Sequence, residues 1–390
     1  MQYRQFGKTG LRMSALGFGC MRLPRTADGS VDEPTAHAMM AYALDHGINY
    51  FDSAYRYHNG ESELVVGRFL AQGNRHRVHM ATKLPPGEVK DASDFDRLLN
   101  EQLAKLQTDY LDVYLIHGLR LERWEFVRDL GIREWLDGVK KSGRARAVGF
   151  SFHDSLDAFK SIVDSYDWDV CQVQYNYMNA NFQAGTEGVK YAASKGLAVV
   201  VMEPLLGGRL VDPPSDIAAM WASAPVKRSP AEGGLQWVWN QPEVSVVLSG
   251  MSAMEQMREN VASAERSGVG LLSDEELALV GRVRDTYEAR TAVPCTSCAY
   301  CMPCPNGVDI PRTFSAINSG ITYNKMEDAR NRYQRLMPGQ DPKILASSCI
   351  ECRTCEEKCP QRIPIADWMP VLHEVLTGQR EFSPDLVSSR

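Results

Sequence analysis

The feature that most restricts the fold of this 390-residue chain is a repeating alternation of strand-like and helix-like segments. Eight short runs rich in β-branched and aromatic residues recur at intervals of about 30 residues, with amphipathic stretches between them. The predicted strands are residues 15–19, 49–54, 78–84, 111–117, 145–151, 170–176, 197–203 and 244–250. Strands that alternate with helices in this way form parallel sheets.

Eight such units predict an α/β fold in which the sheet closes into a (β/α)8 TIM barrel. An open, doubly wound sheet is the alternative, but its first strand is usually followed by the Gly-rich fingerprint GxGxxG. Here that position reads LGFGCM, from Leu16 to Met21, and lacks the third glycine. The sequence therefore favours the barrel.

The chain is longer than the roughly 250–300 residues at which a single core stops growing, so a second, smaller domain is expected. A hairpin over residues 3–16 is predicted before the barrel, and a helix that starts with a capping box is predicted over 273–289. We place the barrel domain at residues 1–285 and the C-terminal domain at 286–390. Four prolines between 211 and 230 predict a long loop on the active face of the barrel.

The composition argues against several classes of partner. The net charge is −6 and the basic residues form no long run, so nucleic acid is not an expected partner. No apolar run approaches the ~18 residues of a membrane span, so no membrane association is expected. The start, MQYRQFGKTG, has no apolar signal segment, which predicts a cytoplasmic protein. A small molecule remains the expected partner.

Three consecutive predicted strands end in residues whose chemistry suits the reduction of a carbonyl group. Asp52, Lys83 and His117 close these strands, and Tyr57 follows in the next loop. In TIM barrels the reactive groups lie at such strand ends. A hydride added to a carbonyl carbon leaves an alkoxide, so a proton donor must lie within hydrogen-bond reach.

Tyr57 is the predicted proton donor. Its ordinary pKa of about 10 is high for that role at neutral pH, and an ammonium group at Lys83 would lower it. Asp52 would keep the lysine charged and in place, and His117 would orient the carbonyl oxygen. Each residue alone also has a structural explanation, such as a simple charge pair. Four compatible residue types at neighbouring strand ends favour catalysis.

Over roughly residues 1–285 the sequence resembles the aldo-keto reductase family. The resemblance is carried by GLRMSALGFGCM, NYFDSAYRYHNGESELVVGRFL, ATK, LDVYLIH, VGFSFHD, QVQYN, VMEPLLGG and GMSAMEQMREN. It implies that Asp52, Tyr57, Lys83 and His117 form the catalytic tetrad of an NAD(P)-dependent oxidoreductase acting on CH–OH or C=O groups. It also implies NADP, with NAD possible, bound extended across the barrel mouth.

The resemblance places the nicotinamide carboxamide near Ser151 and Gln172. The full set of implied cofactor residues is Gly19, Cys20, Met21, Asp52, Ser151, Gln172, Met202, Pro204, Leu205, Gly207, Gly208, Ser252, Gln256, Glu259 and Asn260. Two positions depart from the family pattern. Phe152 replaces the usual asparagine, which removes one carboxamide hydrogen bond, and Met202 stands where an aromatic residue often stacks on the nicotinamide.

Three further positions depart from the family pattern: Gly250 and Gln256 near the cofactor's 2′-phosphate, and His58 after the predicted proton donor. Gly250 and Gln256 stand where many members place Lys and Arg against the 2′-phosphate, so the choice between NADPH and NADH stays open. The adenosine-end residues nevertheless match the branch that resembles potassium-channel β subunits, which also bind NADP. Arg209 is the nearest basic candidate for a phosphate contact on its loop. His58 replaces the glycine usual after the catalytic tyrosine. Its side chain either reaches the pocket or faces solvent, and we favour solvent.

The ten cysteines fall into two groups. Cys20 and Cys171 stand alone in apolar runs and are predicted to be inert buried thiols. The other eight lie within residues 295–359, where clustered cysteines favour metal over disulfides. The stretch SSCIECRTCEEKCP contains C-x2-C-x2-C-x3-C-P, the pattern of bacterial-type [4Fe–4S] ferredoxins. The predicted ligands of two [4Fe–4S] clusters are Cys295, Cys298, Cys301, Cys304, Cys349, Cys352, Cys355 and Cys359.

In this pattern the fourth cysteine ligates the other cluster. The cross-paired arrangement joins Cys359 to the first three upstream cysteines, and Cys304 to the first three downstream cysteines. The first run has two residues instead of three before Cys304, which departs from the pattern. Zinc held by four thiolates is the alternative. The long helical stretch between the two cysteine runs resembles α-helical dicluster ferredoxin domains. The whole chain resembles aldo-keto reductases fused to such a domain.

Two functions remain open. The first is an NAD(P)H-dependent oxidoreductase of small carbonyls or alcohols, in which the clusters are an accessory and Arg120, Arg123 and Trp124 suit an anionic or aromatic substrate group. The second is an electron-transfer protein or redox-sensing regulator, in which the barrel binds nucleotide and the clusters exchange electrons with a redox partner protein. Nicotinamide passes two electrons as hydride and each cubane passes one, and the sequence has no flavin fingerprint to mediate. The intact tetrad favours the oxidoreductase.

Overall fold

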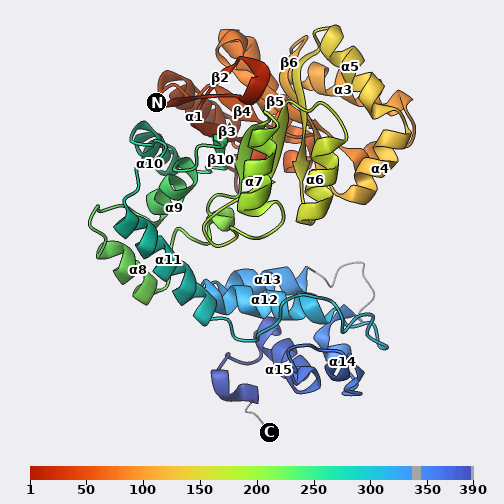
Figure 1. Cartoon of the computed structure of the whole chain (residues 1–390), viewed down its shortest axis with the longest axis vertical. Helices are drawn as coiled ribbons and strands as arrows, with labels where there is room; N and C mark the ends of the chain where they lie inside the picture. Colours follow the sequence, from red (N-terminus) through yellow and green to blue (C-terminus); the bar gives the residue numbers. More distant parts are fainter. Residues whose placement is uncertain (336–343, 388–390) are drawn as a thin grey trace. The chain divides into compact units, whose positions relative to one another are not determined.

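The computed structural model describes residues 1–335 and 344–387. The chain divides into two compact units. The first unit contains residues 1–207 and 231–280, and the second contains 208–230 and 281–390. Figure 1 shows the course of the chain through both.

Parallel strands of the first unit close into a barrel in the spatial order β10, β3, β4, β5, β6, β7, β8, β9. Their bounds are β3 Leu16–Gly19, β4 Tyr50–Asp52, β5 His79–Leu84, β6 Leu111–Leu119, β7 Ala145–Phe152, β8 Val170–Gln174, β9 Ala198–Met202 and β10 Val244–Ser249. Every predicted strand overlaps one of these, and the predicted (β/α)8 barrel is confirmed.

Helices lie outside the strands of the barrel (Figure 1). Their bounds are α1 Glu33–Asp45, α2 Glu61–Phe69, α3 Ser93–Leu106, α4 Leu121–Asp129, α5 Ile132–Lys141, α6 Leu156–Asp164, α7 Gly185–Ser194, α9 Pro230–Trp239 and α10 Met254–Glu265. In α3, the apolar residues spaced three and four apart are buried, as the sequence predicts. The helix ends at Gln107, which adopts the left-handed conformation with φ of 50°.

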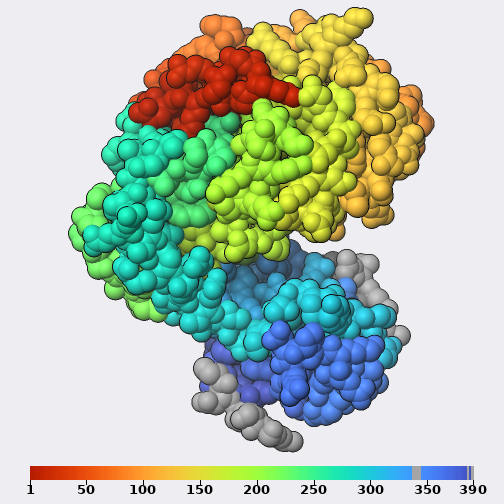
Figure 2. Space-filling model, in the orientation of Figure 1, coloured from red at the N-terminus to blue at the C-terminus, as the bar shows by residue number. Residues whose placement is uncertain are grey.

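An N-terminal hairpin closes one end of the barrel. Strands β1, Tyr3–Gln5, and β2, Arg12–Ser14, pair antiparallel, as the sequence predicts. Phe6 and Met13 are fully buried in the cluster of residues that fills the barrel interior. The backbone N–H of Lys8 donates to the carbonyl of Gly196, just before β9 (2.8 Å); Figure 2 shows the hairpin, in red, on the surface of this unit. With the N-terminal end closed, the opposite strand ends are left for the site.

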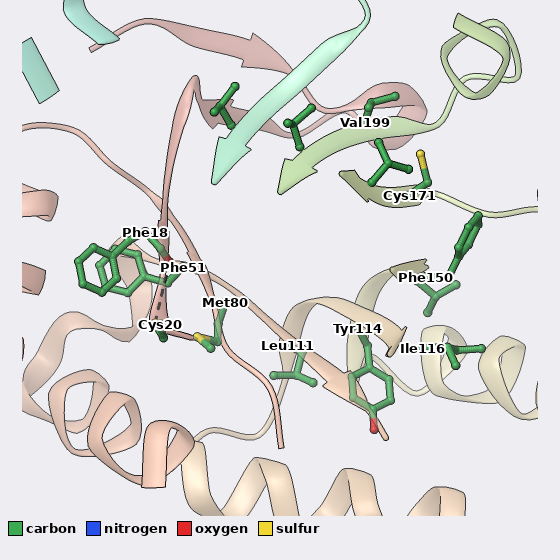
Figure 3. Packing of buried hydrophobic residues seen from close by; sticks show 14 of the residues in the cluster. Phe18, Cys20, Phe51, Met80, Leu111, Tyr114, Ile116, Phe150, Cys171 and Val199 are labelled. Atoms are coloured by element: carbon green, nitrogen blue, oxygen red, sulfur yellow. Dashed lines mark hydrogen bonds between the residues drawn. The ribbon is translucent and has the colours of Figure 1, made fainter. Parts of the chain in front are cut away.

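The main core fills the space between the strands and the surrounding helices. Figure 3 shows Phe18 and Phe51 packed together, with ring centroids 5.2 Å apart. Cys20 and Cys171 are both fully buried in this core, so the prediction of buried thiols is confirmed. Burial raises the pKa of each thiol, which keeps both in the unreactive protonated form.

The second unit is helical. Its helices are α8 Ser215–Ala222, the end of α11 Asp274–Ala289, α12 Ile310–Thr322, α13 Met326–Gln334, α14 Thr354–Glu357 and α15 Ile365–Thr377. Phe314, Ile317 and Leu372 are among the buried residues of its separate core. The predicted helical character of the stretch between the cysteine runs, residues 305–348, is confirmed by α12 and α13. Residues 336–343 of this stretch lie outside the described residues. Among the described helices, none has the length and apolar character of a membrane span.

The proline-rich segment differs from its prediction as a long loop on the active face of the barrel. Residues 208–230, which we call the insert, belong to the second unit and contain α8. Pro214 precedes the first turn of α8 in an extended conformation. Ile217 and Trp221 lie one helical turn apart and are both buried. This i, i+4 pair is the signal in the sequence that indicates a helix here.

Ion pairs hold the insert to the rest of its unit. Asp216 of α8 pairs with Arg290 at 3.1 Å, and Asp212 pairs with Lys325 at 2.7 Å. The hydroxyl of Thr286 in α11 approaches the sulfur of Met220 at 3.6 Å. Figure 1 shows α8 beside α11.

Candidate active site and cysteine sites

Strand ends of the first unit bring all four predicted catalytic residues together. Lys83, fully buried on β5, donates from Nζ to Oδ1 of Asp52 at the end of β4 (2.6 Å). The same Nζ lies 2.7 Å from the carbonyl of Ser53 and 3.4 Å from the hydroxyl of Tyr57. The Tyr57 and His117 rings meet edge to face, with centroids 5.9 Å apart. One amine thus links a carboxylate to a phenol beside an imidazole.

The local fold explains how His117 reaches this group. Neighbouring residues of a strand point to opposite faces, so Lys83 faces the barrel axis while Thr82 faces α3. The pairing of β6 with β7 is irregular between Ile116 and Leu119, and His117 lies within that irregularity. Such irregularities are common next to active sites, where they re-aim a side chain.

A buried polar network behind β5 was not predicted. Glu63 of α2 accepts hydrogen bonds from Oγ1 of Thr82 and Nε2 of Gln102, both at 2.6 Å. Gln102 also donates to the backbone carbonyl of Lys83 at 3.0 Å. Burial raises the pKa of Glu63. Because each of these bonds fixes the outer face of β5, the network orients Lys83 on the inner face. Glu63 and Gln102 lie within helical patterns and Thr82 lies within a strand pattern, so only their contacts in the fold show the role.

Electrostatics of the site differ in one respect from the prediction. Burial raises the pKa of Tyr57, and the ammonium of Lys83 offsets only part of this, so the net shift is upward instead of downward. Burial also opposes charge on Lys83, but the charges of Asp52 and Tyr57 outweigh it and raise the pKa of the lysine. Lys83 therefore stays a cation, which favours the phenolate once Tyr57 gives up its proton.

His117 is neutral at physiological pH. Burial and the charge of Lys83 lower the pKa of its imidazole to about 3. A neutral imidazole has one N–H donor and one acceptor nitrogen. It can therefore donate a hydrogen bond to a carbonyl oxygen without competing with Tyr57 as the acid.

Two predicted carboxamide contacts lie beside the tetrad. Gln172 of β8 donates from Nε2 to Oδ2 of Asp52 at 3.0 Å. Ser151 of β7 accepts a hydrogen bond at Oγ from the backbone N–H of Gly118 at 2.7 Å. Phe152 is fully buried in the main core, with its ring centroid 5.0 Å from that of Phe159. Phe152, at the position where the family usually has asparagine, therefore contributes to the packing of the main core.

The other predicted cofactor residues lie at the ends of β3, β9 and β10. Cys20 and Pro204 are buried, Met202 and Leu205 are half-buried, and Met21 is exposed. Gly207 has a φ of 69°, a conformation that favours glycine. At the end of β3, a Cβ on Gly19 would lie 3.1 Å from the carbonyl oxygen of Ser249, so a side chain here would require a small shift of its neighbours. Gly208 begins the insert.

The predicted adenosine-end residues divide by exposure. Ser252, Gln256 and Glu259 are exposed, and Gln256 accepts a hydrogen bond from the backbone N–H of Ser252 at 2.8 Å. Asn260 is buried and donates to Oγ of Ser249 at 2.9 Å. Asn260 therefore supports the end of β10, whereas Ser252, Gln256 and Glu259 lie at the surface.

In the second unit, the eight clustered cysteines surround two pockets. One pocket is lined by Cys295, Cys298, Cys301 and Cys359, and the other by Cys304, Cys349, Cys352 and Cys355. Each pocket thus takes three cysteines from one run and one from the other, the arrangement of the cross-paired prediction. Ile310 and Ile365 line both pockets.

The spacing of these cysteines bears on the metal. In a zinc site four sulfurs lie about 2.3 Å from one ion, so the thiols must nearly touch. Within residues 1–335 and 344–387, no three His, Cys, Asp or Glu side chains converge closely enough to hold a single metal ion. Cysteines that ring a pocket suit a cluster of several irons, whose corners are spread apart.

Comparison with known proteins decides the family. Residues 15–284 match the aldo/keto reductase family, and residues 294–363 match the 4Fe-4S dicluster domain. The chain belongs to the aldo/keto reductase family. It is an oxidoreductase of the subgroup in which the barrel is followed by a 4Fe-4S dicluster domain.

Relatives of this reductase include L-galactose dehydrogenase from Arabidopsis thaliana, which is 30% identical over an alignment of 285 residues; the match covers 67% of this chain and 88% of that protein. Protein tas from Escherichia coli is 26% identical, over 74% of this chain and 99% of its own length. Among solved structures, aldo-keto reductase AKR11C1 from Bacillus halodurans in its holo form is similar with a TM-score of 0.62. It is 27% identical and covers 73% of this chain and 96% of its own. An aldo-keto reductase from Klebsiella pneumoniae in complex with NADPH has a TM-score of 0.60, at 24% identity and the same coverage.

Arg22 is a residue of the reductase that the sequence interpretation missed. Its Nη1 donates to the carbonyl of Gly207 at 2.7 Å. A Cβ on Gly250 would lie 3.4 Å from the side-chain carbons of Arg22, so the side chain lies along that glycine. Arg209, the predicted basic candidate, instead lies over the ring of Tyr323 in the second unit, 5.9 Å from its centroid. The position of Arg22 just after LGFGCM, at a barrel strand end, is the signal that could have found it.

Two other expectations for the reductase need correction. Trp124 is buried in the main core against Trp168, with ring centroids 5.3 Å apart, so it is no candidate for a substrate contact. Arg123 donates to the carbonyl of Gly118, at 3.1 Å, next to His117. His58 was expected to face solvent. It is half-buried and accepts a hydrogen bond at Nε2 from the backbone N–H of Leu23 at 3.1 Å.

Proposed function

We propose that this reductase uses NADPH to reduce a small carbonyl compound, or oxidises the alcohol in the reverse direction. The observation that carries the proposal is the position of Lys83 Nζ, within hydrogen-bond distance of both Asp52 and Tyr57. A cation held between a carboxylate and a phenol supports proton transfer by the phenol, because it stabilises the phenolate that remains.

The proposed reaction divides between the cofactor and the residues of the tetrad. The reduced nicotinamide, when bound, supplies the hydride. Tyr57 gives its proton to the oxygen of the carbonyl group as that oxygen becomes an alkoxide. Lys83 stabilises the resulting phenolate, and Asp52 holds Lys83 in place. The neutral His117 donates a hydrogen bond to the same oxygen and so orients it.

The barrel mouth has features that fit an extended dinucleotide. Glycine at positions 19 and 207 leaves room where a side chain would meet neighbouring atoms. Arg22 bridges from its own loop to Gly207 and lies along Gly250, and it offers a guanidinium to phosphate oxygens. We propose Arg22 as the phosphate-binding residue, and Ser151 with Gln172 as the carboxamide contacts. The proposal favours NADPH, and NADH is the alternative.

We propose two [4Fe–4S] clusters in the second unit, one in each cysteine pocket. Each pocket offers the four thiols that a cubane needs. When bound, the clusters supply one-electron chemistry. The proposed functional domains are residues 1–285 for the hydride reaction and 286–390 for the clusters. We propose the cytoplasm as the location, because its reducing conditions keep cysteine thiols available as cluster ligands.

The two cysteine pockets also favour a second candidate function. An enzyme that only transfers hydride has no need of one-electron carriers, so the clusters support electron exchange with a redox partner protein. In that case the barrel supplies nucleotide binding, and the clusters transfer electrons or sense the redox state.

One experiment separates these functions. The protein is purified without oxygen, and a panel of small aldehydes, ketones and their alcohols is assayed with NADPH or NADH, with the clusters intact and after their removal. The first function predicts NADPH oxidation that persists, within about tenfold, when the clusters are removed. Turnover that needs both the clusters and an added one-electron acceptor would instead support the second. Tighter binding of NADH than of NADPH by more than about tenfold, roughly 1.4 kcal/mol, would contradict the cofactor proposal.

Arg22→Ala tests the phosphate contact within the same preparation. We expect NADPH to bind on the order of tenfold more weakly, since one charge-assisted contact is lost. Arg12→Ala is the matched control, because Arg12 is an exposed arginine of the hairpin at the closed end of the barrel. Equal affinities in both variants would exclude Arg22 from the phosphate site.

A further inference from the structure

His58, the residue after Tyr57, links two loops of the barrel mouth. Its Nε2 accepts a hydrogen bond of 3.1 Å from the backbone N–H of Leu23. Leu23 ends the short 3₁₀ helix Cys20–Arg22, which follows β3 and contains the proposed phosphate-binding arginine. A single side chain therefore connects the loop that carries the proposed acid to the loop that borders the proposed cofactor site.

The backbone around His58 is unfavourable for the residues that occupy it. His58 and Asn59 have φ values of 52° and 55°, in the left-handed region that glycine adopts most easily. Residues held in such conformations cluster at functional sites, where the surrounding structure maintains them. The bond to Leu23 is one interaction that maintains this conformation, and a glycine at position 58 could not make it.

Two further hydrogen bonds join the segment after β3 to the start of α2, which follows the Tyr57 loop. Oγ of Ser62 donates to the carbonyl of Cys20 at 3.2 Å. The backbone N–H of Val31 donates to Oε2 of Glu61 at 3.3 Å. Of the three connections, the one made by His58 is adjacent to Tyr57 in the chain, so its loss would move the phenol most directly.

We propose that His58 is a positioning residue for proton transfer, which holds Tyr57 in place through the hydrogen bond that its neutral ring accepts from Leu23. The proposal rests on the proposed function of Tyr57 as the acid. Only an unprotonated Nε2 can accept a hydrogen bond. In the imidazolium, Nε2 carries a proton that would face the N–H of Leu23, and this hydrogen bond beside Tyr57 would break. Reduction should therefore slow on the acid side of neutrality.

The charged groups around the ring determine where that change occurs. Arg25 and Asp28 come from the loop after β3, Glu61 comes from α2, and these residues line a cavity of about 330 Å³ together with His58. Burial and the charge of Arg25 lower the pKa of His58, the charge of Glu61 and hydrogen bonds with the backbone of Cys20 and Met21 oppose them, and the net value lies below the ordinary 6.5. Because the folded-state pKa is lowered, the bond is present at neutral pH and is lost as pH falls through that pKa.

The test compares His58→Gln and His58→Ala with wild type, all with their clusters intact. Single-turnover reduction of p-nitrobenzaldehyde by bound NADPH is followed from pH 5 to pH 8. The side-chain carbonyl of glutamine can accept the bond from Leu23 but does not titrate, so His58→Gln should keep the neutral-pH rate within about threefold and lose the acid limb. His58→Ala should slow the reaction on the order of tenfold or more at neutral pH and approach the wild-type rate at the acid end, with NADPH affinity within about threefold of wild type.

His76→Gln is the matched control, since His76 is an exposed histidine whose replacement should leave the pH profile unchanged. An acid limb that persists in His58→Gln, or a neutral-pH rate of His58→Ala equal to wild type, would overturn the proposal. The pKa of His58, measured by NMR with ¹³C-labelled histidine and assigned by its absence in His58→Gln, should lie below 6.5. A pKa at or above 6.5 overturns the proposal even in a protein with no turnover, whereas absence of turnover alone contradicts only the proposed function.

Discussion

The barrel site and the cysteine sites hold their functional groups in different ways. In the barrel, Lys83 is fully buried and its amine contacts Asp52, Ser53 and Tyr57, all groups of the protein itself. In the second unit, Cys355 is the one buried cysteine of the eight, and Cys298 and Cys352 are exposed. The groups of the barrel site are therefore held by hydrogen bonds to one another, whereas the cysteines surround two pockets.

This difference indicates which of the two sites has its geometry before a cofactor or cluster binds. The barrel tetrad sits on the ends of strands whose other residues form a large core, so its geometry needs no cofactor to hold it. The cysteines lie mostly on loops, and the short helix α14, Thr354–Glu357, is the regular structure nearest to them in the downstream run. Where loops are held by a metal group, the free energy of binding that group becomes free energy of folding. We therefore expect the barrel to survive loss of its cofactor and the second unit to depend on its clusters.

The largest expected effect is on catalysis and leaves both units folded. Tyr57→Phe keeps the aromatic ring and removes the proton, so turnover should fall by ~10²–10⁴-fold. NADPH affinity and the thermal melting of both units should stay close to wild type, because the ring packing is retained. Tyr55→Phe is the control: Tyr55 donates to Glu101 at 2.9 Å, away from the tetrad, and its loss should leave turnover unchanged. Turnover within about threefold of wild type in Tyr57→Phe would exclude it as the acid.

Removal of the clusters tests the comparison directly. Anaerobic chelation should increase amide hydrogen exchange in α12 and α15 by about a hundredfold or more, because their packing depends on the loops that hold the clusters. Exchange in the barrel strands should be unchanged. The insert should lose protection together with α12, since it belongs to the same compact unit. Protection that persists in α12 without clusters would show that the second unit, like the barrel, is preorganised.

The cross-paired ligands predict which cluster each cysteine serves. Cys359→Ser should damage the cluster of the upstream run, although Cys359 lies in the downstream run. Cys355→Ser should damage the other cluster. Each variant should retain about half of the iron and acid-labile sulfide of a wild-type protein that contains two cubanes. Electron paramagnetic resonance of the reduced variants should show two different remaining spectra. The same remaining spectrum in both variants would contradict the cross-pairing.

The sequence predicts those features of the structure that leave a pattern among residues close together in the chain. Strands and their ends follow from alternating patterns along the chain, so the sequence places Asp52, Lys83 and His117 at neighbouring strand ends. The two cysteine pockets follow from spacing and from the known geometry of the pattern. Arg22 was missed because its proposed role rests on contacts with Gly207 and Gly250, which are far away in sequence.

The electrostatic prediction for Tyr57 shows the same limit. The sequence indicates that a lysine is close and that its charge lowers the pKa of the phenol, and this part is correct. The depth of burial depends on the whole fold, and burial is the larger influence. The insert was misassigned for a related reason: a count of prolines describes the local backbone and does not reveal which core Ile217 and Trp221 join.

The smallest predicted effect concerns the insert, which leaves the barrel chain after β9 yet belongs to the unit with the clusters. Asp216→Asn removes the charge that pairs with Arg290 at 3.1 Å. Both side chains are partly exposed, and exposed pairs typically contribute ~0.2–1 kcal/mol, so exchange in α8 should rise by about two- to fivefold. Asp164→Asn, which breaks an exposed pair with Lys195 in the barrel, is the matched control and should not change exchange in α8. If both variants leave α8 unchanged, the buried Ile217 and Trp221 alone hold the insert, and its place in the second unit rests on apolar packing instead of charge.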